Sequence, residues 1–204
     1  AALLAALPLA AGACPWAAAQ DAPAAPETPL VLEVTGDDVN LRSGPSIDYH
    51  DVGRVARGDL VLAAAASLDG ARDGDWTRVR IPGGPVVHVF APLVDWQEGA
   101  LRARVRSDDV LMRATPAQAH LPLKDQKLAR GDELVVLGVS DGDDGRWLRV
   151  VAPERVHVWM HTRYVRPIGV TLSAERLERL AESRLDALTE GRTKEERVAR
   201  RRAA

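Results

Sequence analysis

A duplicated segment is the strongest constraint on how this sequence of 204 residues folds. The stretch DDVNLRSGP, from Asp37 to Pro45, reappears as DDVLMRATP from Asp108 to Pro116. Three further landmarks follow in the same order in each copy: Arg57-Gly58-Asp59 and Arg130-Gly131-Asp132, Trp76 and Trp147, and Val89-Phe90-Ala91 and Val158-Trp159-Met160. This order predicts two copies of one small folding unit, with function in a surface presented twice rather than in one deep catalytic cleft.

Short apolar stretches separated by turn residues run through both copies. Val52 to Val55 and Trp76 to Ile81 are typical of short strands, and Pro82-Gly83-Gly84 predicts a turn. Frequent turns without a helical period are typical of a small barrel or sandwich. We therefore predict a mainly β fold, with two tandem small SH3-like β-barrels at residues 30–97 and 101–168, each of about five strands.

The final segment, residues 171–204, has a helical pattern instead. Its leucines fall on one face of a helix, with arginine and glutamate on the other: Leu177, Leu180, Leu185 and Leu188. Ser173 predicts the start and Gly191 the end of this helix, and the spacing of Thr193 and Glu196 predicts a second one. The leucine face could pair with itself or a partner, fold back onto the second barrel, or belong to a solvated linker. The helical pattern runs up to Ala204 without a residue that would end it, so we expect the natural protein to continue.

The first residues predict export. Residues 1–19 resemble a signal peptide whose start is missing, with an apolar run and small residues at Ala17-Ala18-Ala19. This run is too short to span a bilayer, which needs about 20 apolar residues. Residues 20–29, rich in proline and alanine, form a spacer. Cys14 follows a loose lipobox, so a lipid anchor there is the alternative to cleavage after Ala19. We expect a protein of the periplasm or cell envelope.

Charge and residue chemistry argue against several functions. The net charge of -2 predicts no field that would gather nucleic acid. The only cysteine, Cys14, lies in the leader, which leaves no thiol nucleophile in the mature chain. His157 and His161 lie on a predicted strand, where two rings four residues apart are a poor zinc pair. The acidic glycine turns from Asp69 and Asp141 lack calcium-loop spacing. We expect no catalytic residue, metal site or cofactor.

The first copy also resembles a known family. The string VNLRSGPS, from Val39 to Ser46, is similar to the opening of bacterial SH3 domains, the SH3b family. Gly53, the Arg57-Gly58-Asp59 turn and the stretch from Gly74 to Val79 resemble its later elements, and Trp159 to Val165 resembles its closing segment. The resemblance covers about residues 30–168 and is weaker in the second copy. It implies a non-catalytic module of exported bacterial proteins that binds peptidoglycan or an envelope protein partner.

The large aromatic residues are the candidates for ligand binding, because aromatic rings offer wide contact area at low entropic cost. The predicted binding residues are Tyr49, Trp76, Phe90, Trp147 and Trp159. The alternative is that they pack in the barrels; Tyr49, in the loop from Ser46 to His50, is expected to be the most exposed. The loop from Ser46 to His50 differs in sequence from its counterpart in the second copy, residues 117–121. We expect the residues that determine function to lie where these loops differ. Two other functions stay open: a scaffold assembling through barrels and tail, and a targeting fragment of a larger cell-wall enzyme.

Overall fold

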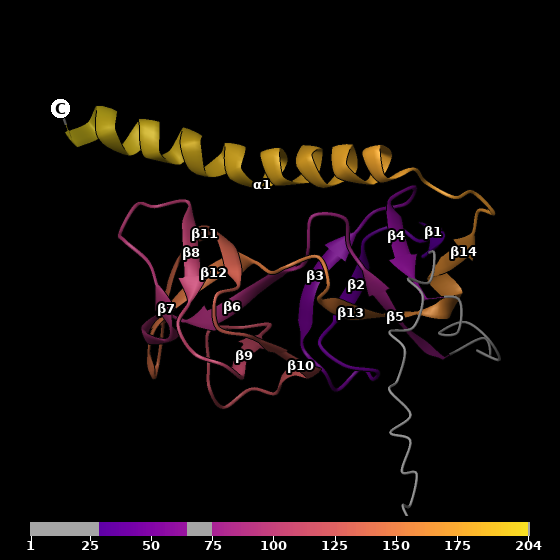
Figure 1. Cartoon of the computed structure of the whole chain (residues 1–204), viewed down its shortest axis with the longest axis horizontal. Helices are drawn as coiled ribbons and strands as arrows, with labels where there is room; N and C mark the ends of the chain where they lie inside the picture. The colour runs from indigo at the N-terminus through magenta and orange to yellow at the C-terminus, as the bar shows by residue number, and fades with distance from the viewer. Residues whose placement is uncertain (1–28, 65–74, 204) are drawn as a thin grey trace, which may run out of the picture.

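The computed structural model describes residues 29–64 and 75–203 (Figure 1). Within them the chain forms two antiparallel seven-stranded sheets and one long C-terminal helix, so the prediction of a mainly β chain with a helical tail is confirmed. The expected signal peptide, the Cys14 anchor, residues 20–28 of the spacer and the acidic turn from Asp69 to Gly74 lie outside the described residues.

The two sheets have equivalent strand orders, which reflect the repeat. Sheet A has the order β14-β1-β4-β5-β13-β2-β3 and sheet B the order β7-β8-β11-β12-β6-β9-β10. Sheet A consists of β1 (Leu30–Val34), β2 (Val39–Arg42), β3 (Asp51–Val55), β4 (Leu60–Ala63), β5 (Trp76–Arg80), β13 (His157–His161) and β14 (Val165–Pro167). Sheet B consists of β6 (Val86–Phe90), β7 (Val94–Asp95), β8 (Arg102–Val105), β9 (Val110–Arg113), β10 (Pro122–Leu128), β11 (Glu133–Gly142) and β12 (Gly145–Val151).

The two copies exchange their closing strands. Strand β6, from the end of the first copy, pairs with β12 of the second, while β13 of the second copy pairs with β5 of the first. The short last strands are exchanged as well: β7 of the first copy pairs with β8 of the second, and β14 of the second copy pairs with β1 of the first. Each of these last strands is preceded by one turn of 3₁₀ helix, η2 (Ala91–Leu93) or η3 (Thr162–Tyr164). Neither sheet is therefore built from residues 30–97 or 101–168 alone.

The strand pairing corrects one alignment drawn from the sequence. Phe90 lies opposite Trp147, and His161 lies opposite Trp76. The counterpart of Phe90 is thus His161, two residues beyond the Trp159 with which the sequence landmarks aligned it. The error arose because both segments carry several alternating apolar residues, so the pattern fits equally well after a shift of two.

The two connections that cross between the sheets lie against each other. Pro82-Gly83-Gly84-Pro85, predicted as a turn, carries the chain from β5 in sheet A to β6 in sheet B. The Ala152 N–H donates to the Pro85 carbonyl at 2.9 Å, which joins this connection to the returning one. At Gly84 φ is +87°, and a Cβ atom would lie 1.9 Å from the Ala152 carbonyl oxygen. Only glycine fits this close approach of two backbones.

The repeated Arg-Gly-Asp motif forms the same turn in both copies. Gly58 and Gly131 have φ values of +87° and +92°, a region that favours glycine. The carboxylates of Asp59 and Asp132 each accept a hydrogen bond of 2.8 Å from the backbone N–H three residues earlier. These shared residues therefore specify turn geometry.

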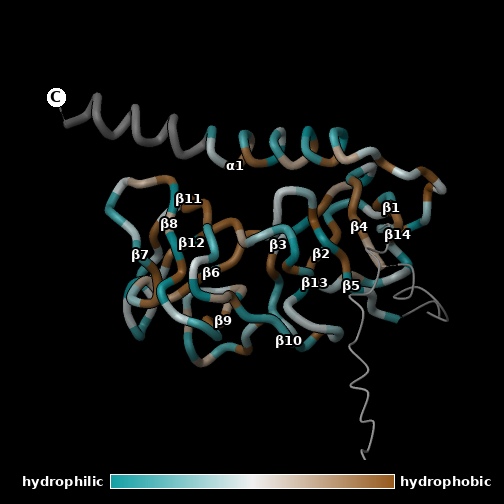
Figure 2. The backbone as a smooth tube through the Cα atoms, viewed as in Figure 1, coloured by the Kyte–Doolittle hydropathy of each residue, from teal (hydrophilic) through white to brown (hydrophobic). Residues whose placement is uncertain are grey.

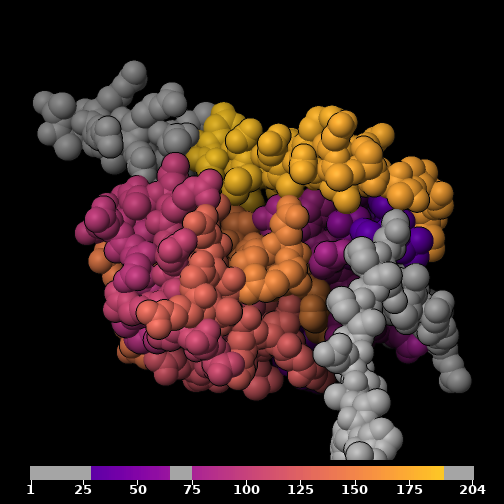
Figure 3. Space-filling model, in the orientation of Figure 1, coloured from indigo at the N-terminus to yellow at the C-terminus, as the bar shows by residue number. Residues whose placement is uncertain are grey.

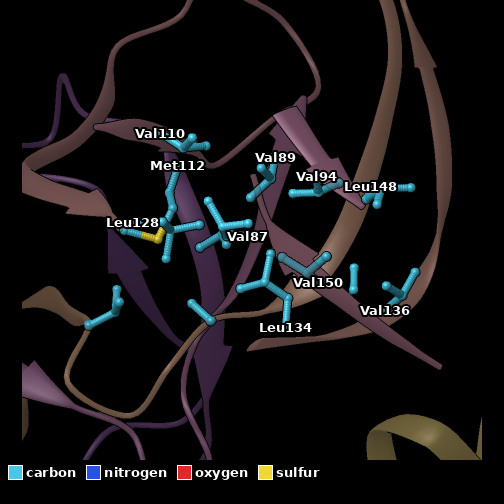
Figure 4. Close-up of a cluster of buried hydrophobic side chains, with 14 of the residues drawn as sticks. Val87, Val89, Val94, Val110, Met112, Leu128, Leu134, Val136, Leu148 and Val150 are labelled. Atoms are coloured by element: carbon cyan, nitrogen blue, oxygen red, sulfur yellow. The ribbon is translucent and has the colours of Figure 1, made fainter. Parts of the chain in front are cut away.

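Apolar burial holds the exchanged strands in place. Val87 and Val89 of β6 are fully buried among side chains of the second copy, including Leu148 of β12 (Figure 4). In the core of sheet A, Val158 and Met160 of β13 are equally buried among first-copy residues. Burying a valine or leucine side chain stabilises a fold by about 1.5–3 kcal/mol, so each closing strand is anchored in the opposite sheet.

The helix α1 (Ala174–Ala203) runs along one side of the molecule past both sheets (Figures 1 and 3). Ser173 caps it as predicted, because its side-chain hydroxyl oxygen accepts a hydrogen bond from the Arg176 N–H at 3.4 Å. Hydrophobic and hydrophilic residues alternate along residues 174–190 of this helix (Figure 2). Leu177 and Leu180 pack against a cluster formed by Val31, Leu62 and Leu172. The first half of the leucine face therefore lies against sheet A.

The predicted break at Gly191 is wrong. The backbone stays helical through Gly191 and Thr193 to Ala203, so the tail is one helix instead of two. A glycine inside a helix costs about 1 kcal/mol relative to alanine, which strong helix formers on both sides offset. Glu190, Arg192 and Lys194 are such residues.

Candidate functional site

The most distinctive surface feature of sheet A is an aromatic groove with a volume of about 270 Å³. It lies between the loop after β2 and the 3₁₀ turn η3. The residues that line it are Asp37, Asp38, Val39, Asn40, Arg42, Ile47, Trp76, His161, Arg163 and Tyr164. We call this set the Trp76 groove. Seven of these positions belong to the first copy and the last three to the second, so the strand exchange completes the groove.

Three rings form a continuous row in the Trp76 groove. The Trp76 and His161 ring centroids are 5.5 Å apart at an interplanar angle of 63°. The His161 and Tyr164 centroids are 5.9 Å apart at 61°. Edge-to-face contacts of this kind are favourable between aromatic rings and fix their orientation. The groove therefore offers a preformed aromatic surface, with the half-buried Trp76 at one end.

Arg42 connects this aromatic row to the neighbouring loop. Its guanidinium donates to the carbonyls of Ile47 at 2.9 Å and Tyr49 at 2.6 Å, and it pairs with Asp51 at 3.1 Å. Its central carbon also lies 6.0 Å from the centre of the Trp76 ring. Because these contacts hold the loop, Ile47 is presented at the rim with 76% of its surface exposed.

Tyr49 is half-buried, like Trp76, Phe90 and Trp159, so its exposure does not distinguish it from these candidates. Its side chain packs over the backbone of Gly44, where a Cβ atom would lie 2.3 Å from the tyrosine ring. The glycine of the Ser-Gly-Pro motif makes room for this ring. Ile47 and Asp48 are the residues of this loop that are exposed to solvent.

The groove carries both signs of charge. Two hydrogen bonds of 3.1 Å join Asp37 to Arg57, and this bonding, then the arginine charge, lowers the pKa of the Asp37 carboxyl below its usual value. The guanidinium carbon of Arg163 lies 4.5 Å from the centre of the Tyr164 ring. Asn40 Oδ1 is buried and has no hydrogen-bond partner among the described residues. A ligand with both hydrogen-bond donors and carboxylates matches this lining.

The equivalent position on sheet B is closed. Trp147 is only 1% exposed, and its indole N–H donates to Asp144 at 2.8 Å. This bond is the main cause of the lowered pKa of Asp144, and the same carboxylate accepts from the Gln118 N–H at 2.7 Å. At Gly142 a Cβ atom would lie 2.1 Å from the Pro116 carbonyl oxygen. The hairpin between β11 and β12 is thus tied to the loop after β9, and Trp147 packs as a core residue.

The other two predicted residues also lie outside the Trp76 groove. Phe90 is half-buried beside Trp147, with 5.2 Å between the ring centroids. Trp159 lies on β13 with the Arg78 guanidinium 5.1 Å from the centre of its ring. Of the five aromatic residues selected from the sequence, only Trp76 lines the groove.

Sequence reasoning missed the residues that complete the groove, above all His161 and Tyr164. A signal for them was present. At the constant offset that relates Trp76 to Trp147, His161 aligns with Phe90 and Tyr164 with Leu93. That alignment makes His161 equivalent to Phe90, but nothing in the sequence shows that His161 of the second copy lies beside Trp76 of the first.

Two other features of the described residues bear on function. Residues 29–64 and 75–203 contain no group of three or more histidine, cysteine, aspartate or glutamate side chains placed to hold a metal ion. Within the same ranges, no helix has the length and apolar character needed to cross a membrane.

Comparison with known proteins adds no relative: no family model, no curated protein and no solved structure matches this chain.

Proposed function

We propose that this chain is a non-catalytic binding protein of a bacterial envelope, made of two SH3b-like barrels, and that it binds peptidoglycan through the Trp76 groove. In this proposal the protein is exported by the signal-like leader at residues 1–19. The two barrels exchange their closing strands, so that a single functional groove forms from both copies of the repeat.

The observation that carries the proposal is the aromatic row of Trp76, His161 and Tyr164, flanked by Arg42 and Arg163. Aromatic faces stack on sugar rings and on flat peptide groups. Guanidinium groups bind carboxylates through charge-assisted hydrogen bonds. Peptidoglycan presents sugars and carboxylate-bearing peptides side by side. The lining of the groove therefore offers aromatic faces for the sugars and guanidinium groups for the carboxylates of a muropeptide.

Co-sedimentation with purified sacculi tests this function. We expect the wild-type chain to pellet with sacculi, and Trp76→Ala and Tyr164→Ala each to weaken binding by about 10-fold, since stacking contributes about 1–3 kcal/mol by alanine substitution. Trp159→Ala is the matched control, because it removes an indole on β13 outside the groove. The proposal is wrong if the wild type stays in the supernatant, or if all three variants pellet like the wild type.

The alternative of a scaffold that assembles through its leucine face has less support. Leu177 and Leu180 already pack within the chain, against Val31 and Leu62. Self-association through these leucines would require the helix to leave sheet A and expose that cluster.

A further inference from the structure

A second cavity, of about 250 Å³, lies where the two sheets and the helix meet. Its charged lining comes from three parts of the molecule: Arg54 of β3 in sheet A, His88 and Arg149 of sheet B, and Arg184 of α1. Leu41 and Leu188 supply part of its apolar wall. We call this the interface cavity. It is separate from the Trp76 groove, and nothing below depends on the function proposed for that groove.

The interface cavity holds an excess of positive charge. None of the described residues that line it carries a carboxylate. Among the described residues, Arg149 and Arg184 form no ion pair, whereas Arg54 pairs with Asp38 at 2.5 Å. Arg149 and Arg184 therefore both line this space without a salt-bridge partner among the described residues. Like charges that line one space repel one another, so an anion that enters this space would be attracted by both arginines.

Arg184 is the most unusual of these groups, because it is half-buried beneath its own helix. Burial lowers the pKa of its guanidinium, and the charge of Asp59 acts in the opposite direction. Asp59 lines the neighbouring cavity of about 330 Å³ instead, and no hydrogen bond or salt bridge joins it to Arg184. Arg184 lines both this neighbouring cavity and the interface cavity. Its guanidinium donors therefore remain available to a ligand.

His88 adds a further donor or acceptor to the cavity. Its Nδ1 lies 3.0 Å from the Ala114 carbonyl oxygen, and because a carbonyl only accepts, Nδ1 carries the proton. The Nε2 atom is left for a ligand. Burial is the main cause of the lowered pKa of His88, and the charge of Arg149 lowers it further. A bound anion would offset that charge and favour the protonated, donating ring.

We propose that the interface cavity is a binding site for a phosphate group, either as the free ion or as part of a small phosphate ester. Planar guanidinium forks match the oxygens of phosphate, and two unpaired arginines balance a doubly charged oxyanion better than a single carboxylate. The cavity also leaves room beside the phosphate for a small organic group against the leucines. Bound there, the phosphate would join sheet A, sheet B and α1.

Titration of the full chain with inorganic phosphate at constant ionic strength tests the site, with binding measured by calorimetry and by the shift of the unfolding temperature. A ligand that binds only the folded state raises stability in proportion to ln(1 + [L]/Kd). We expect a saturable stabilisation. Arg149→Gln and Arg184→Met are each expected to weaken phosphate binding at least about 10-fold, the change typical of one lost charge-assisted hydrogen bond. Arg149 lies on sheet B, so its variant tests the site even if Arg184→Met loosens the helix.

Arg179→Met is the control, because Arg179 is exposed on the same helix and reaches only Glu175, at 4.0 Å. It should bind phosphate like the wild type. Glycerol 3-phosphate and acetate are titrated in parallel: tighter binding of the ester identifies an organic phosphate as the ligand, and equal binding identifies the free ion. The proposal fails if phosphate does not bind saturably, if acetate binds equally well, or if both arginine variants bind phosphate like the control.

Discussion

Trp76 and Trp147 occupy the same position in the two sheets, yet their surroundings are opposite. Trp76 is half-buried and lines an open groove, whereas Trp147 is 1% exposed and bonded to Asp144. The residue opposite each indole differs as well, being His161 in sheet A and Phe90 in sheet B. The comparison shows that one repeated tryptophan can be a surface group in one copy and a core group in the other. Its neighbours decide which.

Those neighbours differ in polarity. Asn40 and Tyr164 on sheet A correspond to Leu111 and Leu93 on sheet B. Asn40 and Tyr164 line the groove, whereas Leu93 packs against the core of sheet B and Leu111 is exposed. The exchanged strands place second-copy residues beside Trp76, and each copy supplies residues to the other's sheet.

The largest contrast should appear when each tryptophan is removed. Trp147→Ala should lower the free energy of unfolding by about 3–5 kcal/mol, the usual cost of deleting a buried tryptophan. Trp76→Ala should lower it by only about 1 kcal/mol, because a half-buried ring leaves little cavity. Urea unfolding followed by circular dichroism measures both. Equal losses would mean that the two indoles are buried to the same degree.

Gly84 tests whether the strands are exchanged at all. Gly84→Ala places a methyl group against the Ala152 carbonyl and should cost about 2–4 kcal/mol, as overpacking and backbone strain combine. Gly99→Ala is the control. Gly99 has a similar φ of +84° but open space around it, so its variant should lose only about 1–2 kcal/mol. If the two variants unfold at the same urea concentration, the two crossing connections do not lie together.

His157 of sheet A corresponds to Val86 of sheet B, so the pH dependence of stability distinguishes the two sheets. Burial, then the charge of Arg78, lowers the pKa of His157 from 6.5 to about 4, while Asp125 acts weakly in the other direction. The fold thus favours the neutral ring. Its contribution is complete above pH 6.5 and is lost as the pH falls towards 4.

His157→Val should therefore flatten the decline in stability between pH 6.5 and 4, by on the order of 1–2 kcal/mol after solvent screening at this partly exposed site. Urea unfolding at several pH values provides the comparison. His88, whose pKa is also lowered, accounts for a residual slope in the same direction. An unchanged slope in the variant would show that His157 titrates normally in the folded state.

The smallest effect is expected at Asn40, whose counterpart is Leu111. Asn40→Leu removes a buried oxygen without a hydrogen-bond partner, so stability should rise by up to about 1 kcal/mol. Binding to sacculi should fall at the same time, because the groove loses an acceptor. A loss of stability would indicate that Asn40 already has a partner that holds it in the fold.

The sequence was sufficient for the features that depend on local chemistry. The duplication, the glycine turns at Gly58 and Gly131, the β pattern and the Ser173 cap could all be predicted, because each depends on residues close together in the chain. The strand exchange could not. Strand β6 has the same alternation of buried and exposed residues whether it pairs with its own copy or with the other.

The groove was only partly predictable for the same reason. Trp76 was identified as an aromatic candidate, but His161 and Tyr164 reach it only through the exchange. Tyr49 was expected to be the better exposed candidate because it lies in a loop, but the sequence did not show that its ring packs over Gly44. Gly191 was read as a helix end, yet the residues around it propagate the helix.

The central claim, that the groove on sheet A binds ligand while its counterpart on sheet B is core, is tested most directly by the indole N–H resonances of ¹⁵N-labelled protein. The chain has five tryptophans, which point mutants assign individually. During titration with soluble muropeptides, the Trp76 resonance should shift saturably and the Trp147 resonance should stay in place. A shift of Trp147 without a shift of Trp76 would contradict this account.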